Sequence, residues 1–276
     1  MRNILEANRK LSIVNQLIKQ KRSVQYKESG LLAGIDLGTS SIVLVVIDQK
    51  GTPVYAASTL SSVVRDGLVV DYIGAITIVR NLKQDAELSL GVSLKVAAGA
   101  VPPGTYGNNR QVIKHILEES DFECKLIIDE PTAAAKVLNF TEGAIVDVGG
   151  GTMGISILQN NRVIYTADEA TGGHQMTLVI AGYYGISCLE AENIKCKENK
   201  ESEIFQIIKP VVEKMALISH GFINDSKTVV KDMYLVGGAT NFNEFLGVFK
   251  KELGINIYKC SYPEYVTPLG IALSLV

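Results

Sequence analysis

The chain has 276 residues, of which 47% are hydrophobic and 20% are charged, and its formal net charge is −2. A chain of this length forms one large domain or two modest ones, with enough apolar residues for a core in each. The nearly neutral charge argues against a nucleic-acid surface. The sequence has no apolar run of the roughly 18 to 20 residues that cross a membrane. Its first residues also lack the charged-then-apolar order of a secretion signal. We therefore expect a cytoplasmic protein without a membrane span or a nucleic-acid partner.

The four cysteines are Cys124, Cys188, Cys196 and Cys260, and they include no CxxC pair and no neighbouring histidine. This spacing argues against a metal centre or disulfides, and it fits a reducing compartment.

The first twenty residues carry apolar side chains at alternating spacings of three and four, namely Ile4, Ala7, Leu11, Val14 and Ile18. This stripe predicts an amphipathic helix. The polar, basic stretch after it predicts a linker, so residues 1–29 form a separate N-terminal element. Two roles remain open for the helix. It packs on its own chain, or it serves as a tag for a partner's groove.

One sequence unit occurs twice in the chain. Strand-like residues 31–37 lead through a polar turn into the apolar run 42–47 and then into the β-rich stretch 53–58. The same order returns between residues 144 and 167, with Asp147 in place of Asp36 and Gly149 in place of Gly38. The repeat indicates two related halves, each with a phosphate-sized hairpin turn.

The remaining pattern predicts that each half continues as α-β-α. Helices are expected at 72–88, 108–119, 130–138, 172–181, 203–222, 243–253 and 268–275, and strands at 94–100, 125–128, 229–236 and 255–258. Residues 186–201 show only weak periodicity. This order predicts an α/β protein with a mixed sheet flanked by helices in each half. The lobes would comprise residues 30–141 and 142–276, with a helical insertion at 183–225.

The first hairpin turn has residues suited to phosphate. Gly38, Thr39 and Ser40 offer backbone N–H groups and hydroxyls without a bulky side chain, and Asp36 could hold a hydrated Mg²⁺. An ordinary Asp-Xaa-Gly turn is the competing interpretation. The second copy weakens it, because three consecutive glycines, 149–151, cost backbone entropy unless something needs the bare backbone.

Two further motifs could contribute to the same site. Gly237, Gly238 and Ala239 follow an apolar strand, and such a turn suits a flat ring or a phosphate at a helix start. Glu130 stands at a strand-to-helix corner, where it could orient a water molecule. The alanines that follow it are explained by a helix crossing alone.

In their order, these motifs resemble the actin, hexokinase and DnaK-type heat-shock ATPase superfamily. In that superfamily the two Asp-containing turns are phosphate loops, the Glu130 segment is the connecting helix, and the last Gly-Gly turn is the adenosine loop. The resemblance implies a duplicated actin-like ATPase (ribonuclease H-like) fold with two lobes and a nucleotide cleft between them. It is more specific for fold than for activity.

A closer resemblance extends from about residue 31 to the end of the chain. Segments 63–67, 74–80, 102–105, 167–174 and 213–216 resemble EutJ, the chaperone-like ethanolamine-utilisation family. The two resemblances together imply ATP and Mg²⁺ as ligands. They imply catalytic roles for Asp36, Glu130 and Asp147, with Asp36 and Asp147 organising Mg²⁺ through water. The nucleotide-binding residues that they imply are Gly38, Thr39, Ser40, Gly149, Gly150, Gly151, Thr152, Gly172, Gly173, Glu213, Lys214, Gly237, Gly238 and Ala239. For Gly172 and Gly173, a plain helix start is an equally good explanation.

The chain departs from the chaperones in one respect that bears on activity. They carry a large insertion with a catalytic lysine after the third strand, whereas residues 60–71 here contain no lysine. The nearest cations are Arg65 and Arg80. Because phosphoryl transfer depends on positioned charge, this puts fast hydrolysis in doubt and leaves a weak ATPase.

The expected function is therefore an ATP-binding, chaperone-like protein that closes its lobes on Mg·ATP with slow or partner-stimulated hydrolysis. The family resemblance implies that it assists folding, reactivation or assembly of ethanolamine-degrading enzymes or of a microcompartment. A nucleotide-binding assembly scaffold without significant hydrolysis is the alternative. A small-molecule kinase ranks last, because the chain has little room for an acceptor pocket.

Overall fold

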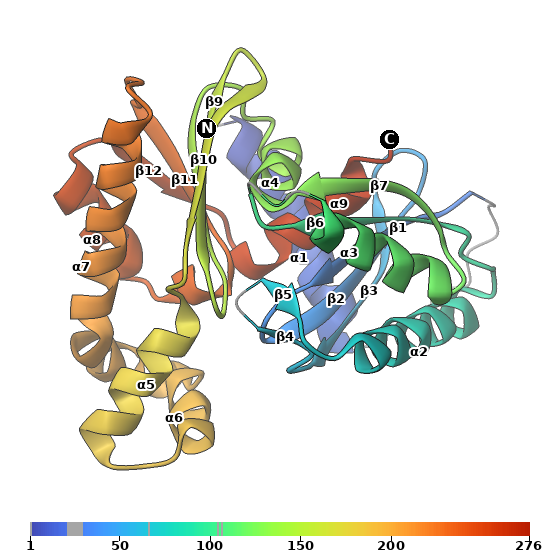
Figure 1. Cartoon of the computed structure of the whole chain (residues 1–276), viewed down its shortest axis with the longest axis horizontal. Helices are drawn as coiled ribbons and strands as arrows, with labels where there is room; N and C mark the ends of the chain where they lie inside the picture. Colours follow the sequence, from blue (N-terminus) through green and yellow to red (C-terminus); the bar gives the residue numbers. More distant parts are fainter. Residues whose placement is uncertain (1, 21–29, 66, 104, 106) are drawn as a thin grey trace.

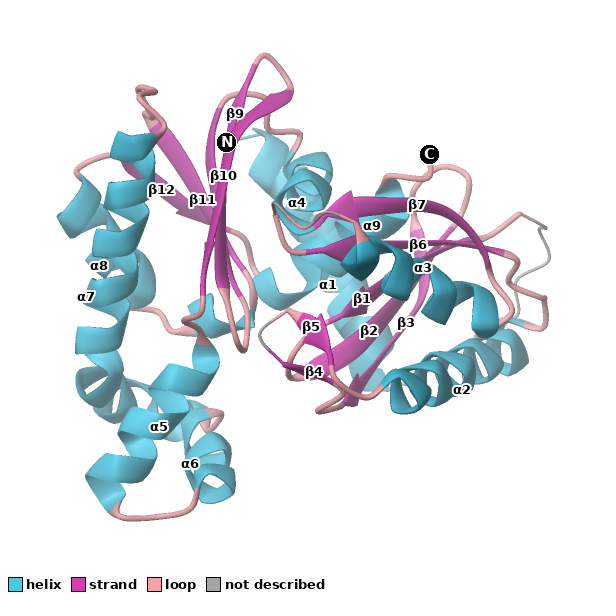
Figure 2. Cartoon of the chain, viewed as in Figure 1, coloured by secondary structure: helices cyan, strands magenta, loops and turns pink. Residues whose placement is uncertain are grey.

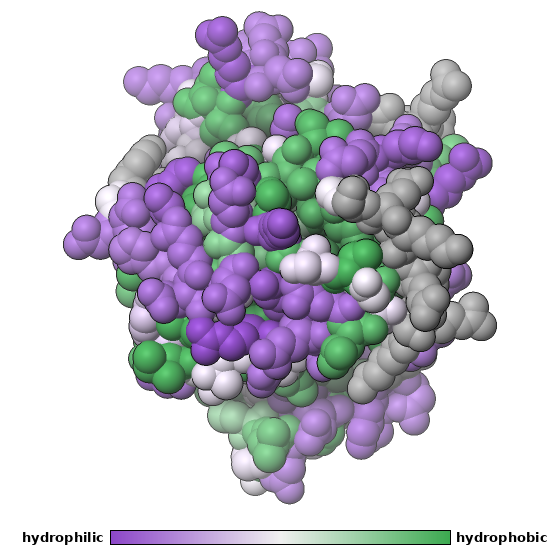
Figure 3. Space-filling model, turned by 90° about the vertical axis from the view of Figure 1, so that its right-hand side faces the viewer, coloured by the Kyte–Doolittle hydropathy of each residue, from purple (hydrophilic) through white to green (hydrophobic). Residues whose placement is uncertain are grey.

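The computed structural model of the chain describes residues 2–20, 30–65, 67–103, 105 and 107–276. The predicted linker after residue 20 lies outside the described residues. No helix in the described ranges is long and apolar enough to cross a membrane. Hydrophilic residues cover most of the first-lobe face in Figure 3, and hydrophobic residues gather in smaller patches between them.

The first sheet has the strand order β3-β2-β1-β6-β7. Its strands are β1 (Leu32–Leu37), β2 (Ser41–Ile47), β3 (Pro53–Leu60), β6 (Val96–Val101) and β7 (Glu123–Asp129). β1, β2 and β3 pair antiparallel, whereas β6 and β7 continue the sheet in parallel on the other side of β1. A small hairpin of β4 (Val64–Arg65) and β5 (Leu68–Val69) follows β3.

The second sheet repeats this topology with the order β10-β9-β8-β11-β12. Its strands are β8 (Gly143–Val148), β9 (Met153–Gln159), β10 (Arg162–Glu169), β11 (Asp232–Val236) and β12 (Asn256–Lys259). The antiparallel and parallel pairings match those of the first sheet strand for strand. The predicted duplication is therefore present in the fold.

Most of the helices form three layers around the two sheets, while α5 and α6 pack together beside α7 (Figures 1 and 2). They are α1 (Arg2–Gln20), α2 (Tyr72–Leu90), α3 (Asn108–Glu119), α4 (Glu130–Leu138), α5 (Gly173–Tyr184), α6 (Cys188–Lys195), α7 (Glu201–Asp225), α8 (Phe245–Leu253) and α9 (Val266–Leu273). α2 and α3 cover the outer face of the first sheet, α7 and α8 cover that of the second, and α1, α4 and α9 lie between the lobes.

The apolar run in β2 follows from burial on both faces of the first sheet. Ile42, Leu44 and Val46 join the core under α2 and α3, while the alternate residues Val43 and Val45 join the core between the lobes. A strand covered on both faces needs a continuous apolar sequence rather than an alternating one.

α1 packs against its own chain. Ala7, Leu11 and Val14 are fully or almost fully buried in the interlobe core, where α1 contacts β3, α4 and α9. The side-chain oxygen of Asn8 also accepts a hydrogen bond of 2.9 Å from the backbone N–H of Ser261. Of the two predicted alternatives, the structure therefore shows the helix docked on its own chain rather than free as a tag.

The sequence pattern assigns residues 142–276, and with them α9, to the second lobe. In the structure, α9 lies on the sheet of the first lobe instead. It packs against β1 and β2 and crosses α4. The close approach depends on two glycines, because a Cβ at Gly34 would overlap the backbone of Ala272, and one at Gly270 would overlap the backbone of Ala133. The chain thus returns to the first sheet after completing the second.

Candidate functional site

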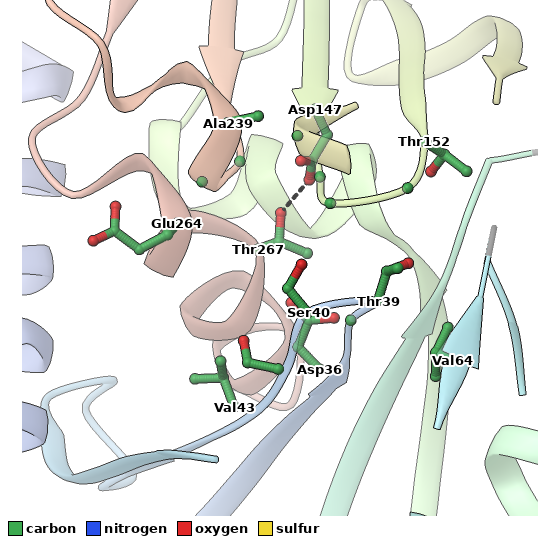
Figure 4. Close-up of a pocket in the computed structure, with 18 of the residues that line it drawn as sticks. Asp36, Thr39, Ser40, Val43, Val64, Asp147, Thr152, Ala239, Glu264 and Thr267 are labelled. Atoms are coloured by element: carbon green, nitrogen blue, oxygen red, sulfur yellow. Dashed lines mark hydrogen bonds between the residues drawn. The ribbon is translucent and has the colours of Figure 1, made fainter. Parts of the chain in front are cut away.

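A cavity of about 860 Å³ lies between the lobes. It brings together most of the residues predicted for the site, which are Asp36, Gly38, Thr39, Ser40, Glu130, Asp147, Gly149, Gly150, Gly151, Thr152, Gly173, Gly237, Gly238 and Ala239. Gly172, Glu213 and Lys214 are not among the residues that line it. In Figure 4, Asp36 and Ser40 from the first hairpin lie near Asp147 and its loop from the second.

The two hairpin turns have the same backbone hydrogen bond. The N–H of Gly38 donates to the carbonyl of Ser41, and the N–H of Gly149 donates to that of Thr152, each over 3.0 Å. The turns also touch each other, since a Cβ at Gly150 would overlap the hydroxyl of Ser40. Glycine at position 150 therefore lets the two lobes meet at their loops.

The start of α5 holds the second loop in place. The N–H groups of Gly173 and His174 donate to the carbonyls of Gly149 and Gly150 over 2.9 and 2.7 Å. A Cβ at Gly172 would lie 2.7 Å from the carbonyl oxygen of Gly149. Gly172 therefore supports the loop from behind.

Three carboxylates line the cavity, of which Asp147 is buried and Asp36 and Glu130 are partly buried. Burial, and then the charge of Asp147, raise the pKa of Asp36 to about 7. Burial also raises the pKa of Glu130 well above its usual value, with further contributions from Asp147 and Asp36. Burial raises the pKa of Asp147 as well, although a 2.7 Å hydrogen bond from the hydroxyl of Thr267 acts in the opposite direction. These groups repel one another when charged, so they fit a cation placed between them.

Asp168 on β10 is a fourth carboxylate in this region, and the sequence prediction does not include it. Burial raises its pKa to about 6, and the charges of Asp147 and Glu169 add to the shift, while a hydrogen bond from Thr152 opposes it. The pairing of Asp168 with Gly154 across β9 and β10 brings it beside the second loop.

Few cations are available to these carboxylates. Among the described residues, the basic side chains that line the cavity are Lys19, Lys195 and Lys197. Arg80 donates instead to the carbonyl of Glu119. No group of three or more His, Cys, Asp or Glu side chains in the described ranges could hold a metal ion by itself. The donor set fits a hydrated divalent ion that takes its other ligands from a bound molecule.

α6 contributes residues to the cavity that sequence patterns alone do not predict. Lys195 is 12% exposed and donates to the carbonyl of Gly173, the hydroxyl of Thr177 and the carboxylate of Glu192 over 3.0, 2.8 and 2.7 Å. Burial raises the pKa of Glu192, but hydrogen bonds from Lys195 and Thr177 bring it below its usual value. Glu192 and Lys195 both line the cavity.

A sequence signal for α6 does exist. Ser187 and Glu190 form a capping box, in which each side chain bonds the other residue's backbone N–H. By contrast, the predicted Glu213 lies on α7 and faces Lys209 at 3.9 Å. α1 adds two more unpredicted lining residues, Asn15 and Lys19.

The turn after β11 and the short helix η2 (Gly238–Asn241) form another wall of the cavity. Gly237 has φ +89°, and a Cβ there would overlap the carbonyl of Val148 and the carboxylate of Asp147. Its N–H donates to the carbonyl of Pro263 over 3.0 Å. Only glycine combines this backbone conformation with such close contact to the second loop.

The two matched sheets and the paired loops at one cleft define an actin-like ATPase fold. A solved structure of MreB5 of Spiroplasma citri bound to ADP is similar, with a TM-score of 0.71 over 88% of this chain and 95% of that chain, at 16% sequence identity. The family model described as type IV pilus assembly protein PilM matches residues 132–260. The predicted fold class is confirmed.

The sequence places the chain more narrowly. It is 39% identical to the ethanolamine utilization protein EutJ of Escherichia coli over 90% of this chain and 87% of that protein. A crystal structure of EutJ from Carboxydothermus hydrogenoformans has a TM-score of 0.92 and 44% identity, and the match covers 98% of this chain and 99% of that chain. The chain belongs to the EutJ family, as its motifs predict.

Proposed function

We propose that this chain is an ATP-binding, chaperone-like protein of ethanolamine utilisation that closes its lobes on Mg·ATP. One observation carries the proposal. Two copies of the same glycine-containing hairpin, one from each lobe, meet at a single cavity with Asp36 and Asp147 beside them. A ligand held by both loops would hold the two lobes together.

The proposed roles follow from the chemistry of each residue. The backbone of Gly149, Gly150 and Gly151 accepts close approach of phosphate oxygens, and the hydroxyls of Thr39 and Ser40 donate to them. Asp36 and Asp147 would hold a hydrated Mg²⁺ by accepting hydrogen bonds from its water molecules. Bound Mg²⁺ supplies positive charge that offsets the charge of the phosphates. Glu130 orients a water molecule near the loops.

Calorimetric titration with Mg·ATP tests this proposal. We expect wild type to bind in the micromolar range and Gly150→Val to lose binding, because the new side chain would overlap Ser40. Gly182→Val is the matched control, since a Cβ at Gly182 on the exposed side of α5 meets nothing within 4 Å. Absence of binding to folded wild type would contradict the proposal.

The proposal includes slow or partner-stimulated hydrolysis. A scaffold that binds nucleotide without turnover is the second candidate, and the shortage of cations beside the carboxylates favours it. Lys195 is engaged by Glu192 and Thr177, and Arg65 is not among the described residues that line the cavity. Single-turnover phosphate release separates the two. Release that a partner accelerates supports the ATPase, and no release over hours supports the scaffold.

The proposed partners are enzymes of ethanolamine degradation or shell proteins of a microcompartment in the cytoplasm. Family membership is what supports this part, because the relatives carry the name ethanolamine utilization protein. Capture of such partners by the purified chain, with and without Mg·ATP, tests it. We expect at least one of them to bind in a nucleotide-dependent way, and equal capture in both conditions would argue against a switch.

A further inference from the structure

Lys259, at the end of β12, holds three backbone carbonyl groups of one short segment. Its Nζ donates to the carbonyl oxygens of Thr240, Asn241 and Phe242 over 2.7, 3.3 and 2.8 Å. These carbonyls belong to the last part of η2 and the residue after it. Carbonyls at the end of a helix have no partner within it, so a charged donor here fixes the end of the helix in one position.

The surroundings of Lys259 are acidic. Burial lowers the pKa of the Lys259 ammonium, and the carboxylates of Glu201, Glu244 and Glu264 act in the opposite direction. Glu201 is also bonded to the side-chain amide of Asn243, just beyond η2, over 3.1 Å. The three carboxylates favour the charged form of the lysine, which makes the strongest hydrogen bonds to carbonyl groups.

The other side of the same segment forms the wall of the cavity. Gly238, Ala239 and Asn241 line it, although Lys259 itself does not. The side-chain amide of Asn241 donates to the carboxylate of Glu264 over 3.1 Å, and Glu264 also lines the cavity. Lys259 therefore acts on the cavity from behind, through the backbone of η2.

We propose that Lys259 is a positioning residue for the wall of the nucleotide cavity that η2 forms. This deepens the proposed function and rests on it. A methionine at this position keeps the aliphatic stem but leaves three carbonyl groups without their donor. η2 then loses its fixed position, so a bound nucleotide meets a wall that must first be ordered.

The test compares three variants by calorimetry with Mg·ATP and by amide hydrogen exchange without nucleotide. Lys259→Met should weaken ATP binding about tenfold, equal to about 1.4 kcal/mol, and speed exchange within residues 237–243. Lys259→Arg keeps charged donors and should bind ATP within about threefold of wild type. Lys251→Met, on the exposed side of α8, is the matched control and should change neither quantity.

The outcomes separate this inference from the function on which it rests. If wild type binds no ATP, the proposed function fails and the role of Lys259 fails with it. If wild type binds but Lys259→Met binds equally well, only the role of Lys259 is overturned. It is also overturned if exchange rises throughout the second lobe rather than in residues 237–243, or if arginine loses as much affinity as methionine.

Discussion

The two loops of the cleft are copies of one hairpin, yet they offer different chemistry. In both, the aspartate stands two residues before the first glycine, and the same N–H to carbonyl bond of 3.0 Å closes the turn. The first loop presents the hydroxyls of Thr39 and Ser40. The second presents bare backbone at Gly150 and Gly151, and Gly150 leaves room for Ser40 from the opposite lobe.

Their aspartates differ in the same way. Asp147 accepts a hydrogen bond from Thr267 of α9, whereas burial and the charge of Asp147 raise the pKa of Asp36 to about 7. The duplication therefore supplies the same loop geometry twice. A contact from outside the repeat, the hydrogen bond from Thr267, stabilises the charged form of Asp147. Four substitutions test how the two copies are held together and how their aspartates differ, and they follow from the largest expected effect to the smallest.

Gly237→Ala should be the most damaging, because it places a Cβ against the second loop at a backbone conformation of φ +89° and ψ 149° that is almost confined to glycine. We expect a loss of about 3–5 kcal/mol in the free energy of unfolding, from backbone strain plus overpacking. Gly254→Ala is the control, since Gly254 has φ +65° but no neighbouring atom within 4 Å. It should cost only about 1–2 kcal/mol. Urea unfolding checks both, and equal losses would show that contact with the second loop is unimportant.

Leu11→Ala tests whether the core between the lobes holds the two copies together. Leu11 is 0% exposed, so its truncation should cost about 3 kcal/mol, as for other buried leucines. Leu5→Ala on the same helix, at a residue 63% exposed, should change stability by less than about 0.5 kcal/mol. Thermal unfolding measures both. A silent Leu11→Ala would show that α1 does not stabilise the interlobe core.

Asp36→Asn should stabilise the protein without ligand at pH 8 while removing Mg·ATP binding. A folded-state pKa of about 7 lies above that of an unfolded aspartate, so the folded state binds more protons and stability falls as pH rises from about 4 to 7. Removing the charge should raise the free energy of unfolding at pH 8 and flatten this slope. The full pKa shift corresponds to about 4 kcal/mol, and solvent screening of the partly exposed Asp36 reduces the expected gain to about 2 kcal/mol. Urea unfolding at pH 5 and pH 8 checks it, with Asp85→Asn as the exposed control. A loss of stability at pH 8 would contradict the expected sign.

Thr267→Val removes the hydrogen bond that the Thr267 hydroxyl donates to Asp147. The aspartate of the second loop then lacks this support for its charge, as Asp36 does in the first loop. The bond lowers the pKa of Asp147, so its contribution is largest when Asp147 is charged and is lost as pH falls. We expect a cost of about 1.5 kcal/mol at pH 8 and less at pH 5. Melting temperatures at the two pH values measure the difference, and a larger cost at pH 5 would be inconsistent with this role for Thr267.

The parts of the site that are predictable from sequence are those encoded locally. Asp36, Asp147 and the glycines after them stand in short strand-turn-strand units, so their pattern predicts both the turn and its repetition. Gly237 is predictable for the same reason, because it follows an apolar strand directly. These residues line the cavity as a set.

The parts that escape prediction depend on contacts between distant segments. Lys195 lies in a stretch with weak periodicity, and only the capping box at Ser187 marks the start of its helix. Glu213 lies in a segment that matches the family, yet α7 turns it toward Lys209. The position of α9 on the first sheet depends on a fit between Gly34 of β1 and the backbone of Ala272 that no local pattern contains.

Hydrogen exchange during a titration with Mg·ATP tests most directly whether both copies bind one ligand. The account predicts that amides in residues 37–41 and 148–152 become protected together, over the same range of ATP concentration. Protection of one segment alone, or of neither at saturating ATP, would contradict a single site shared by the two lobes.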